Sequence, residues 1–295
     1  MDAIFLAELA LNGAFTGLLY SLFAVGLVLI YKSSSVPNLA QGGLTMLGGY
    51  VVLTLSQNVG LPLWLAVPLA AVVMFGAGLG IERVALRRLA GQPIIMILMM
   101  TLGLDILIRG TTLAIWGGTT RPMGLGVSYD PLFVGPLLLS RLHLIGAGVA
   151  IVIFGLVLLF FRTRLGVRLR AISDDYTASW SIGIPVERGV GLSWGLASVS
   201  ALSVAVLWGE IQGVDQSLSL LLLKGITVAL LGGLDSVLGA LIAGILLGIL
   251  ESVGSAVIDP IVGGGSRDLI VAAVLILTVM IRPHGLFGRE HIERL

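Results

Sequence analysis

Charged residues inside long apolar runs are the first candidates for chemistry in this sequence. Lys224 and Glu251 lie in the stretch from Ser217 to Glu251, which is otherwise mostly apolar and which Gly232-Gly233 divides into two runs. A charge at membrane depth costs roughly 2.5–3.5 kcal/mol on insertion scales, so it usually faces a protein interior or a wet cavity and has a partner. The stretch therefore predicts either a polar pathway or a structural ion pair that locks two helices.

The depths of these two charges predict that they meet. At about 1.5 Å per residue, Lys224 lies roughly 10 Å below the outer end of its run and Glu251 roughly 9 Å deep in the antiparallel neighbour. A second pair, Asp105 and Arg109, is four residues apart and therefore shares one helix face. For this second pair we favour mutual neutralisation over a role in transport.

The composition predicts a helical membrane protein with a single domain over residues 1–295. The chain is 57% hydrophobic and only 11% charged, and its mean hydropathy is +1.08, which is too apolar for a soluble globular domain. Its 41 glycines suit close helix packing in lipid. A net charge of +1 argues against a nucleic-acid surface, and the absence of cysteine excludes disulfides and thiolate metal sites.

Apolar spans define the expected elements, about 8–10 transmembrane helices in all. Clean spans are expected at residues 9–31, 61–81, 94–116, 142–161, 189–208 and 268–282. Two further segments are expected to be broken or re-entrant, which is tolerated only where protein or a cavity covers the backbone. They are residues 36–55, which carry polar side chains at Asn38, Gln41 and Thr45, and the stretch around Gly232-Gly233. A short acidic loop is expected to hold Glu210 and Asp215.

The distribution of arginines predicts the orientation. The cationic segments are 83–88, 162–170 and the tail from Arg282, and the positive-inside rule places them in the cytoplasm. With about nine crossings, the N-terminus lies outside and the C-terminus in the cytosol. In this topology L-T-M-L-G-G-Y at 44–50 and V-A-L-L-G-G-L at 228–234 run in opposite directions, as expected of an inverted repeat around a central pathway.

The polar segment 170–188 predicts a short helix between two spans. Ser173, followed by the acidic Asp174 and Asp175, is typical of a helix start, and Gly183 with Pro185 is typical of its end. The face with Ala178, Trp180 and Ile182 is too apolar for a solvated loop. One interpretation is an interfacial helix that rests on lipid headgroups with Trp180 as its anchor.

Motifs for other chemistry are missing from the sequence. It contains no G-x-x-x-x-G-K-[ST] phosphate loop, no G-x-S-x-G elbow and no H-E-x-x-H motif. The chain is therefore not expected to be an enzyme or to bind ATP by that route. An ion-coupled secondary transporter or channel remains an alternative, because such proteins also use inverted repeats and broken helices.

Several motifs together resemble the permease subunits of branched-chain amino acid ABC importers, the LivH type. They are N-G-A-F-T-G-L-L-Y-S-L-F-A-V-G-L at 12–27, N-L-A-Q-G at 38–42, L-K-G-I-T-V-A-L-L-G-G-L at 223–234, L-G-I-L-E-S at 247–252 and R-D-L-I-V-A-A-V-L-I-L-T-V-M-I-R-P-H-G-L-F-G at 267–288. The chain departs from the pattern at Gly43, where many members carry Glu.

The resemblance implies a permease for branched-chain or related amino acids or small amides in the bacterial inner membrane, working by alternating access. It implies a second permease subunit (LivM-like, or a second copy), two cytosolic ATPases that bind ATP and Mg, and a periplasmic substrate-binding protein. Membrane lipid surrounds the chain, which needs no cofactor of its own. The candidate pathway residues are Gln41, Thr45, Lys224, Thr227 and Glu251. The candidate ATPase-coupling residues, within 170–188, are Asp174, Asp175, Ala178, Trp180, Ile182 and Gly183.

Overall fold

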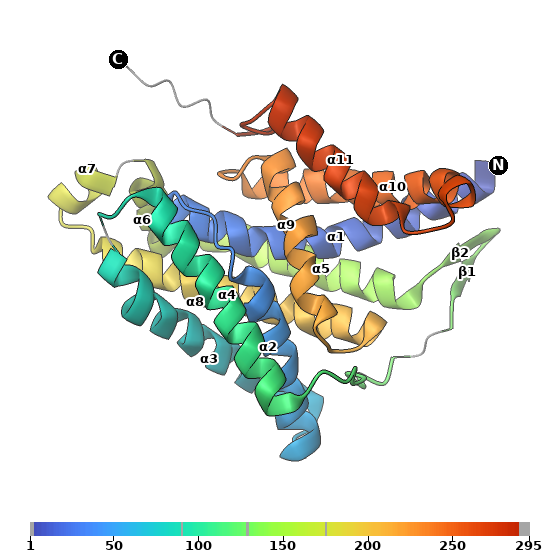
Figure 1. Cartoon of the computed structure of the whole chain (residues 1–295), viewed down its shortest axis with the longest axis horizontal. Coiled ribbons are helices and arrows are strands. Elements are labelled where there is room, and N and C mark those ends of the chain that lie inside the picture. Colours follow the sequence, from blue (N-terminus) through green and yellow to red (C-terminus); the bar gives the residue numbers. More distant parts are fainter. Residues whose placement is uncertain (1–2, 90, 128–129, 175, 289–295) are drawn as a thin grey trace. The chain divides into compact units, whose positions relative to one another are not determined.

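The computed structural model describes residues 3–89, 91–127, 130–174 and 176–288 (Figure 1). Its packing forms two compact units, and each is described by itself. Unit 1 comprises residues 1–24, 127–154 and 223–295, and unit 2 comprises residues 25–126 and 155–222. Three helices contribute residues to both units: α1 (Ala3–Ser34), α5 (Arg141–Phe160) and α9 (Ser217–Gly232). The predicted single domain stays a prediction.

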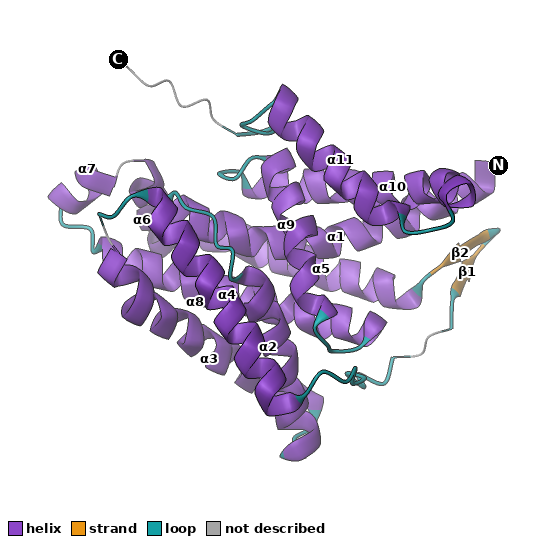
Figure 2. Cartoon of the chain, viewed as in Figure 1, coloured by secondary structure: helices purple, strands orange, loops and turns teal. Residues whose placement is uncertain are grey.

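Helices make up almost all of the regular structure that is described (Figure 2). Within the described ranges, six helices are long and apolar enough to cross a membrane, which confirms the predicted class: α1, α3 (Leu63–Ile81) with its extension to Leu89, α4 (Ile94–Trp116), α5, α8 (Val186–Gln212) and α10 (Val237–Val262). The shorter helices α2 (Gln41–Leu53), α9 and α11 (Ser266–Ile281) raise the count from six to the predicted nine only if each enters the membrane.

Unit 2 is built around α8. This helix packs on α2, on α3 and on α6 (Arg164–Asp174), while α4 packs on α2. In their most apolar windows 67% of α8 is buried but only 17% of α4, so α8 is the central helix of this unit and α4 presents a face to lipid. Gly78 of α3 lies so close to the backbone of Trp194 that no larger side chain would fit. The remaining elements are η1 (Thr54–Asn58), η2 (Glu82–Leu86), η3 (Arg87–Leu89) and α7 (Tyr176–Ser181).

Unit 1 contains α10 and α11, which pack together, with parts of α1, α5 and α9. Two short strands, β1 (Leu132–Val134) and β2 (Leu137–Leu139), form an antiparallel hairpin with Leu132 opposite Leu139. The first half of α1 crosses α10 at glycine. A Cβ atom on Gly17 would meet the Gly244 carbonyl oxygen, and one on Gly13 would lie 2.7 Å from the Ser252 Cβ atom.

The predicted break between the two apolar runs is confirmed. Helix α9 ends at Gly232, and Gly233 adopts a φ of +97°, which favours glycine. The Ser236 side chain then accepts a hydrogen bond from the Gly239 N–H at 2.9 Å and so caps α10. Gly48-Gly49, in contrast, lies inside α2, so the two glycine pairs occupy different places in their helices and the inverted repeat stays a prediction.

Two local predictions are wrong. Ser173 does not start a helix but lies one residue before the end of α6, which begins at Arg164 because its apolar residues pack on α8. A Cβ atom on Gly189 of α8 would lie 2.5 Å from Ile172 of α6. Glu210 is not in a loop: it lies in α8, is buried, and accepts a hydrogen bond from the Leu125 N–H at 2.9 Å. The predicted helix end at Gly183 is confirmed by its φ of +82°.

The glycine crossing of α1 and α10 gives a prediction for stability. Gly17→Ala is expected to destabilise the protein by about 1–3 kcal/mol, because the new methyl group would meet the α10 backbone and force the helices apart. The measurement is the melting temperature of the detergent-purified protein, followed by gel filtration. Gly148→Ala is the matched control, since a Cβ atom there meets nothing within 4 Å. Equal melting temperatures for the two variants would contradict the close crossing.

Candidate functional site

The two predicted charges of unit 1 form an ion pair. Lys224 Nζ lies 2.7 Å from Glu251 Oε1, and the two side chains are 17% and 5% exposed. The Tyr20 hydroxyl of α1 joins them, since it lies 3.4 Å from the same carboxylate oxygen and 3.1 Å from Lys224 Nζ. The predicted meeting of Lys224 and Glu251 is therefore confirmed, and a third group that the sequence reasoning missed completes the cluster.

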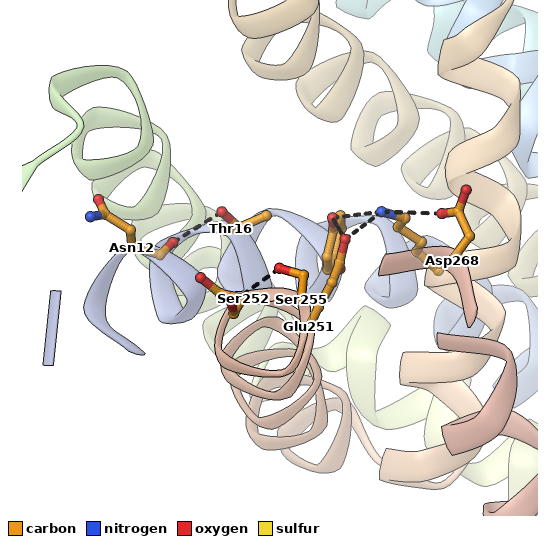
Figure 3. A network of polar contacts seen from close by, with 8 residues as sticks. Asn12, Thr16, Glu251, Ser252, Ser255 and Asp268 are labelled. Carbon is orange, nitrogen blue, oxygen red and sulfur yellow. Dashed lines mark hydrogen bonds and ion pairs between the residues drawn. The ribbon is translucent and has the colours of Figure 1, made fainter. Parts of the chain in front are cut away.

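A second carboxylate approaches Lys224 from α11 (Figure 3). Asp268 Oδ1 lies 3.8 Å from Lys224 Nζ, but the Asp268 side chain is 89% exposed. The ammonium group is therefore held between one buried and one solvated carboxylate. Thr227, one turn further along α9, is buried and donates its hydroxyl hydrogen to the Leu223 carbonyl.

The candidate pathway residues Gln41 and Thr45 lie at the start of α2. Gln41 is fully buried: its Nε2 donates to the Ala197 carbonyl of α8 at 3.0 Å, and its Oε1 accepts from Asn38 Nδ2 at 3.2 Å. Thr45 is also buried and donates its hydroxyl hydrogen to the Gln41 carbonyl. The first turn of this short helix is thus fixed by polar contacts, and its polar side chains are turned into the protein.

Asp105 supplies a cap to α2 from a different helix. Its Oδ2 lies 2.7 Å from Arg109 Nη2, which confirms the predicted pair, and its Oδ1 accepts a hydrogen bond from the Gly43 N–H at 2.8 Å. A carboxylate suits this place because the first N–H groups of a helix are free and carry partial positive charge. A Cβ atom on Gly43 would lie only 2.9 Å from Asp105 Oδ1, so glycine at this position leaves room for the carboxylate.

Another aspartate fixes the start of α9, the helix that carries Lys224. Asp215 accepts hydrogen bonds from the Ser217 N–H at 2.8 Å and from the Thr120 hydroxyl at 2.7 Å. Partial burial raises the pKa of Asp215, but the hydrogen bonds from Ser217 and Thr120 outweigh this effect and leave its pKa below the ordinary value. The carboxylate therefore stays charged at neutral pH and holds this helix end.

The predicted coupling segment occupies the end of α6, all of α7 and the turn that follows. Trp180 and Ile182 are 71% and 75% exposed, although both are apolar. Ala178 and Asp174 are exposed as well, and Asp175 lies outside the described residues. Arg170 donates a hydrogen bond to the Phe161 carbonyl, which ties α6 back to the end of α5. No group of three or more acidic or histidine side chains among the described residues gathers as a metal site.

The ion pair of unit 1 gives a mutational prediction. Lys224→Met and Glu251→Gln are each expected to reduce folded yield or transport sharply, because losing one buried partner typically costs about 3–5 kcal/mol. The double variant should lose less than the sum of the two. Folded yield from gel filtration and melting temperature provide the measurement.

Asp268→Asn serves as the control for this cycle, because an exposed carboxylate contributes little to stability. Strictly additive losses for Lys224→Met and Glu251→Gln would show that the two charges do not stabilise each other.

Comparison with known proteins identifies the family. The model of the family described as "Branched-chain amino acid transport system / permease component" matches residues 9–281. The high-affinity branched-chain amino acid transport system permease protein BraD of Pseudomonas aeruginosa is 30% identical over 298 residues, covering 96% of each chain. Escherichia coli LivH, with the same description, is 28% identical over 304 residues, again covering 96% of each chain.

Two further proteins are similar. A probable branched-chain amino acid transport permease protein LivH of Methanocaldococcus jannaschii is 31% identical over 284 residues, covering 90% of this chain and 88% of its own. The solved structure of PsaBC from Streptococcus pneumoniae in complex with Fab is 17% identical, with a TM-score of 0.47, and covers 93% of this chain and 92% of its own. Because the family model spans residues 9–281, the chain belongs to the permease components of branched-chain amino acid transport systems.

Proposed function

We propose that this chain is the membrane-spanning permease subunit of an ATP-binding-cassette importer for branched-chain or related amino acids or small amides. The observation that carries the proposal is the family match over residues 9–281. Members of this family are transport components and not enzymes. The names of the relatives BraD and LivH support amino acids as the solute class.

The energy for import comes from partner subunits in this proposal. The chain has no phosphate-binding loop of its own, so two cytosolic ATPases bind and hydrolyse ATP with Mg. A periplasmic binding protein delivers the solute, and a second permease subunit, LivM-like or a second copy of this chain, completes the membrane part. The orientation that suits these partners places 83–88, 162–170 and the tail from Arg282 in the cytosol, with the N-terminus outside.

Alternating access is the proposed mechanism. ATP-driven closure of the ATPases moves the cytosolic segments, and the membrane helices respond by opening a cavity to one side and then the other. Gln41, Thr45 and Thr227 are proposed to line this cavity. All three are buried, so the helix packing around them must open during the cycle before a solute can touch them.

The first functional prediction concerns assembly. The isolated chain, reconstituted in liposomes, is expected to show no uptake of a radiolabelled amino acid, because its sequence lacks the G-x-x-x-x-G-K-[ST] phosphate loop and the energy for import comes from the partner ATPases. The complete complex with ATPases, binding protein and partner permease is expected to show uptake that stops when ATP is removed. Uptake by the isolated chain under an ion gradient would contradict the proposal and favour an ion-coupled transporter.

The segment 170–188 is proposed to couple the permease to an ATPase. Its apolar side chains Trp180 and Ile182 are exposed, and exposed apolar side chains of this kind are typical of a surface that binds another protein. The segment is also tied firmly to the rest of unit 2, through the close contact of α6 with α8 at Gly189 and through the Arg170–Phe161 hydrogen bond. Such a link transmits a push from a docked partner into the membrane helices.

The second functional prediction tests this coupling. Ala178→Arg or Gly183→Trp is expected to leave the permease inserted but to weaken ATPase co-purification or abolish substrate-stimulated ATP hydrolysis. The added charge or bulk disturbs a helix that must fit closely in a groove. Because Gly183 has a positive φ, Gly183→Trp also strains the turn, so Ala178→Arg is the cleaner variant.

Val59→Arg is the matched control for the coupling test. It adds the same charge to an exposed residue in a loop that the proposed topology places on the outer face, so ATPase binding and stimulation should stay unchanged. Full complex yield and full stimulation in both coupling variants would move the coupling contact to another cytosolic segment, of which the loop at 83–92 is the next candidate.

A further inference from the structure

Unit 1 carries a row of polar side chains that the proposed function has not yet used. On α1, Asn12, Thr16 and Tyr20 are spaced by four residues and share one helix face. On α10, Ser252 and Ser255 follow Glu251. The close approach of Gly13 to Ser252 brings these faces together, and Figure 3 shows Asn12 and Thr16 beside the labelled residues of α10.

The burial of this row changes along its length. Asn12, Thr16 and Ser252 are half-buried, whereas Tyr20 and Glu251 are only 3% and 4% exposed. In the proposed topology, the half-buried end lies toward the outer surface, because α1 begins and α10 ends there. The row therefore leads from the outer side to the buried Glu251 carboxylate.

Several polar groups of the row already have hydrogen-bond partners. The Asn12 side chain donates to the Glu8 and Leu138 carbonyls and accepts a hydrogen bond from the Ser140 N–H. The Thr16 hydroxyl donates to the Asn12 carbonyl at 3.0 Å, and the Ser255 hydroxyl donates to the Ser252 carbonyl at 3.1 Å. Each hydroxyl oxygen then has only lone pairs to offer. At the end of the row, Glu251 Oε2 is buried and accepts no hydrogen bond from any residue that the structure describes.

A buried carboxylate oxygen that accepts no hydrogen bond from the described residues fits a ligand group that donates. An ammonium group has three N–H donors and no acceptor. Lys224, on the other oxygen of Glu251, adds a positive charge next to this place, and that charge suits a carboxylate. An amino acid carries both groups.

We propose that this row is the outer part of the solute route, which opens when α1 and α10 separate from their close contact at Gly13 and Gly17, and that Glu251 Oε2 then binds the ammonium group of the transported amino acid. This inference rests on the proposed import function and names the chemistry by which the route recognises its solute. The six residues concerned are Asn12, Thr16, Tyr20, Glu251, Ser252 and Ser255.

Cysteine labelling tests the proposal, because the chain has no cysteine of its own. Thr16→Cys and Ser252→Cys are introduced one at a time, and the complete transporter is reconstituted with cysteine-free partners. Labelling is compared between the cationic 2-aminoethyl and the anionic 2-sulfonatoethyl methanethiosulfonate. Both cysteines are expected to react, with a cation-to-anion rate ratio about tenfold above that at the exposed loop residue in Val59→Cys.

Two further results are expected if Glu251 creates this preference. Excess amino acid substrate should slow labelling of Thr16→Cys and Ser252→Cys, and Glu251→Gln should bring their ratio back to that of Val59→Cys. Rates are measured on complex that elutes as a single gel-filtration peak, so a loss of folded yield in Glu251→Gln does not distort them. Leu250→Cys, on the exposed apolar face of α10, is the control that should stay unreactive.

The outcomes separate this inference from the import function. The proposed route would be overturned, with ATP-dependent uptake intact, if neither cysteine reacts. It would also be overturned if the cation-to-anion rate ratio equals that of Val59→Cys and does not change in Glu251→Gln. Absence of ATP-dependent uptake by the unsubstituted complex would instead overturn the import function. Ser252→Cys replaces a hydroxyl by a thiol of similar size. Its labelling rates therefore test the proposal even if the transporter with Thr16→Cys does not assemble.

Discussion

The ion pair between Lys224 and Glu251 is the interaction on which the arrangement of unit 1 depends. Either charge alone would be stranded among apolar side chains, so the pair stabilises the protein only while α9 and α10 hold both groups in contact. The turn at Gly233 and the cap at Ser236 fix where α10 begins. The glycine crossing of α1 and α10 then brings the Tyr20 hydroxyl to the same carboxylate. The helix ends and the small residues of unit 1 thus position the groups that keep Lys224 and Glu251 in contact.

Much of this arrangement could be predicted from the sequence, because charges within apolar runs have few possible partners. The span at residues 94–116 matches α4, and the break at Gly232-Gly233 lies where two apolar runs meet. The spacing of Asp105 and Arg109 was sufficient to predict their pairing. The row Asn12, Thr16 and Tyr20 was missed, although a spacing of four residues on a long apolar helix is a signal that could have identified it.

The remaining features depend on contacts between segments distant in sequence, which local patterns do not encode. The hydrogen bond from the Gly43 N–H to Asp105 joins α2 to α4, and the sequence around either residue does not predict this contact. The charge of Glu210 suggests a loop residue, but its carboxylate lies in α8, where it accepts a hydrogen bond from the Leu125 N–H. Ser173 is a residue type that favours a helix start, but tertiary packing outweighs this preference. Because α6 buries Leu169 and Ile172, the helix extends through Ser173.

Hydrogen-bond saturation distinguishes the polar clusters of the two units. In unit 2, both oxygens of Asp105 have partners, and both ends of the Gln41 amide do. Apart from Arg109 Nε, which lacks an acceptor among the described residues, these side chains have little left to offer a ligand. In unit 1, Lys224 and Tyr20 both contact Glu251 Oε1, and Oε2 accepts nothing from the part of the chain that is described. A purely structural pair gains most when both carboxylate oxygens are used, because an unsatisfied buried acceptor costs stability. The unequal use of the two oxygens is what a site for a transient donor requires, and it is the basis of the proposed contact between Glu251 and the solute.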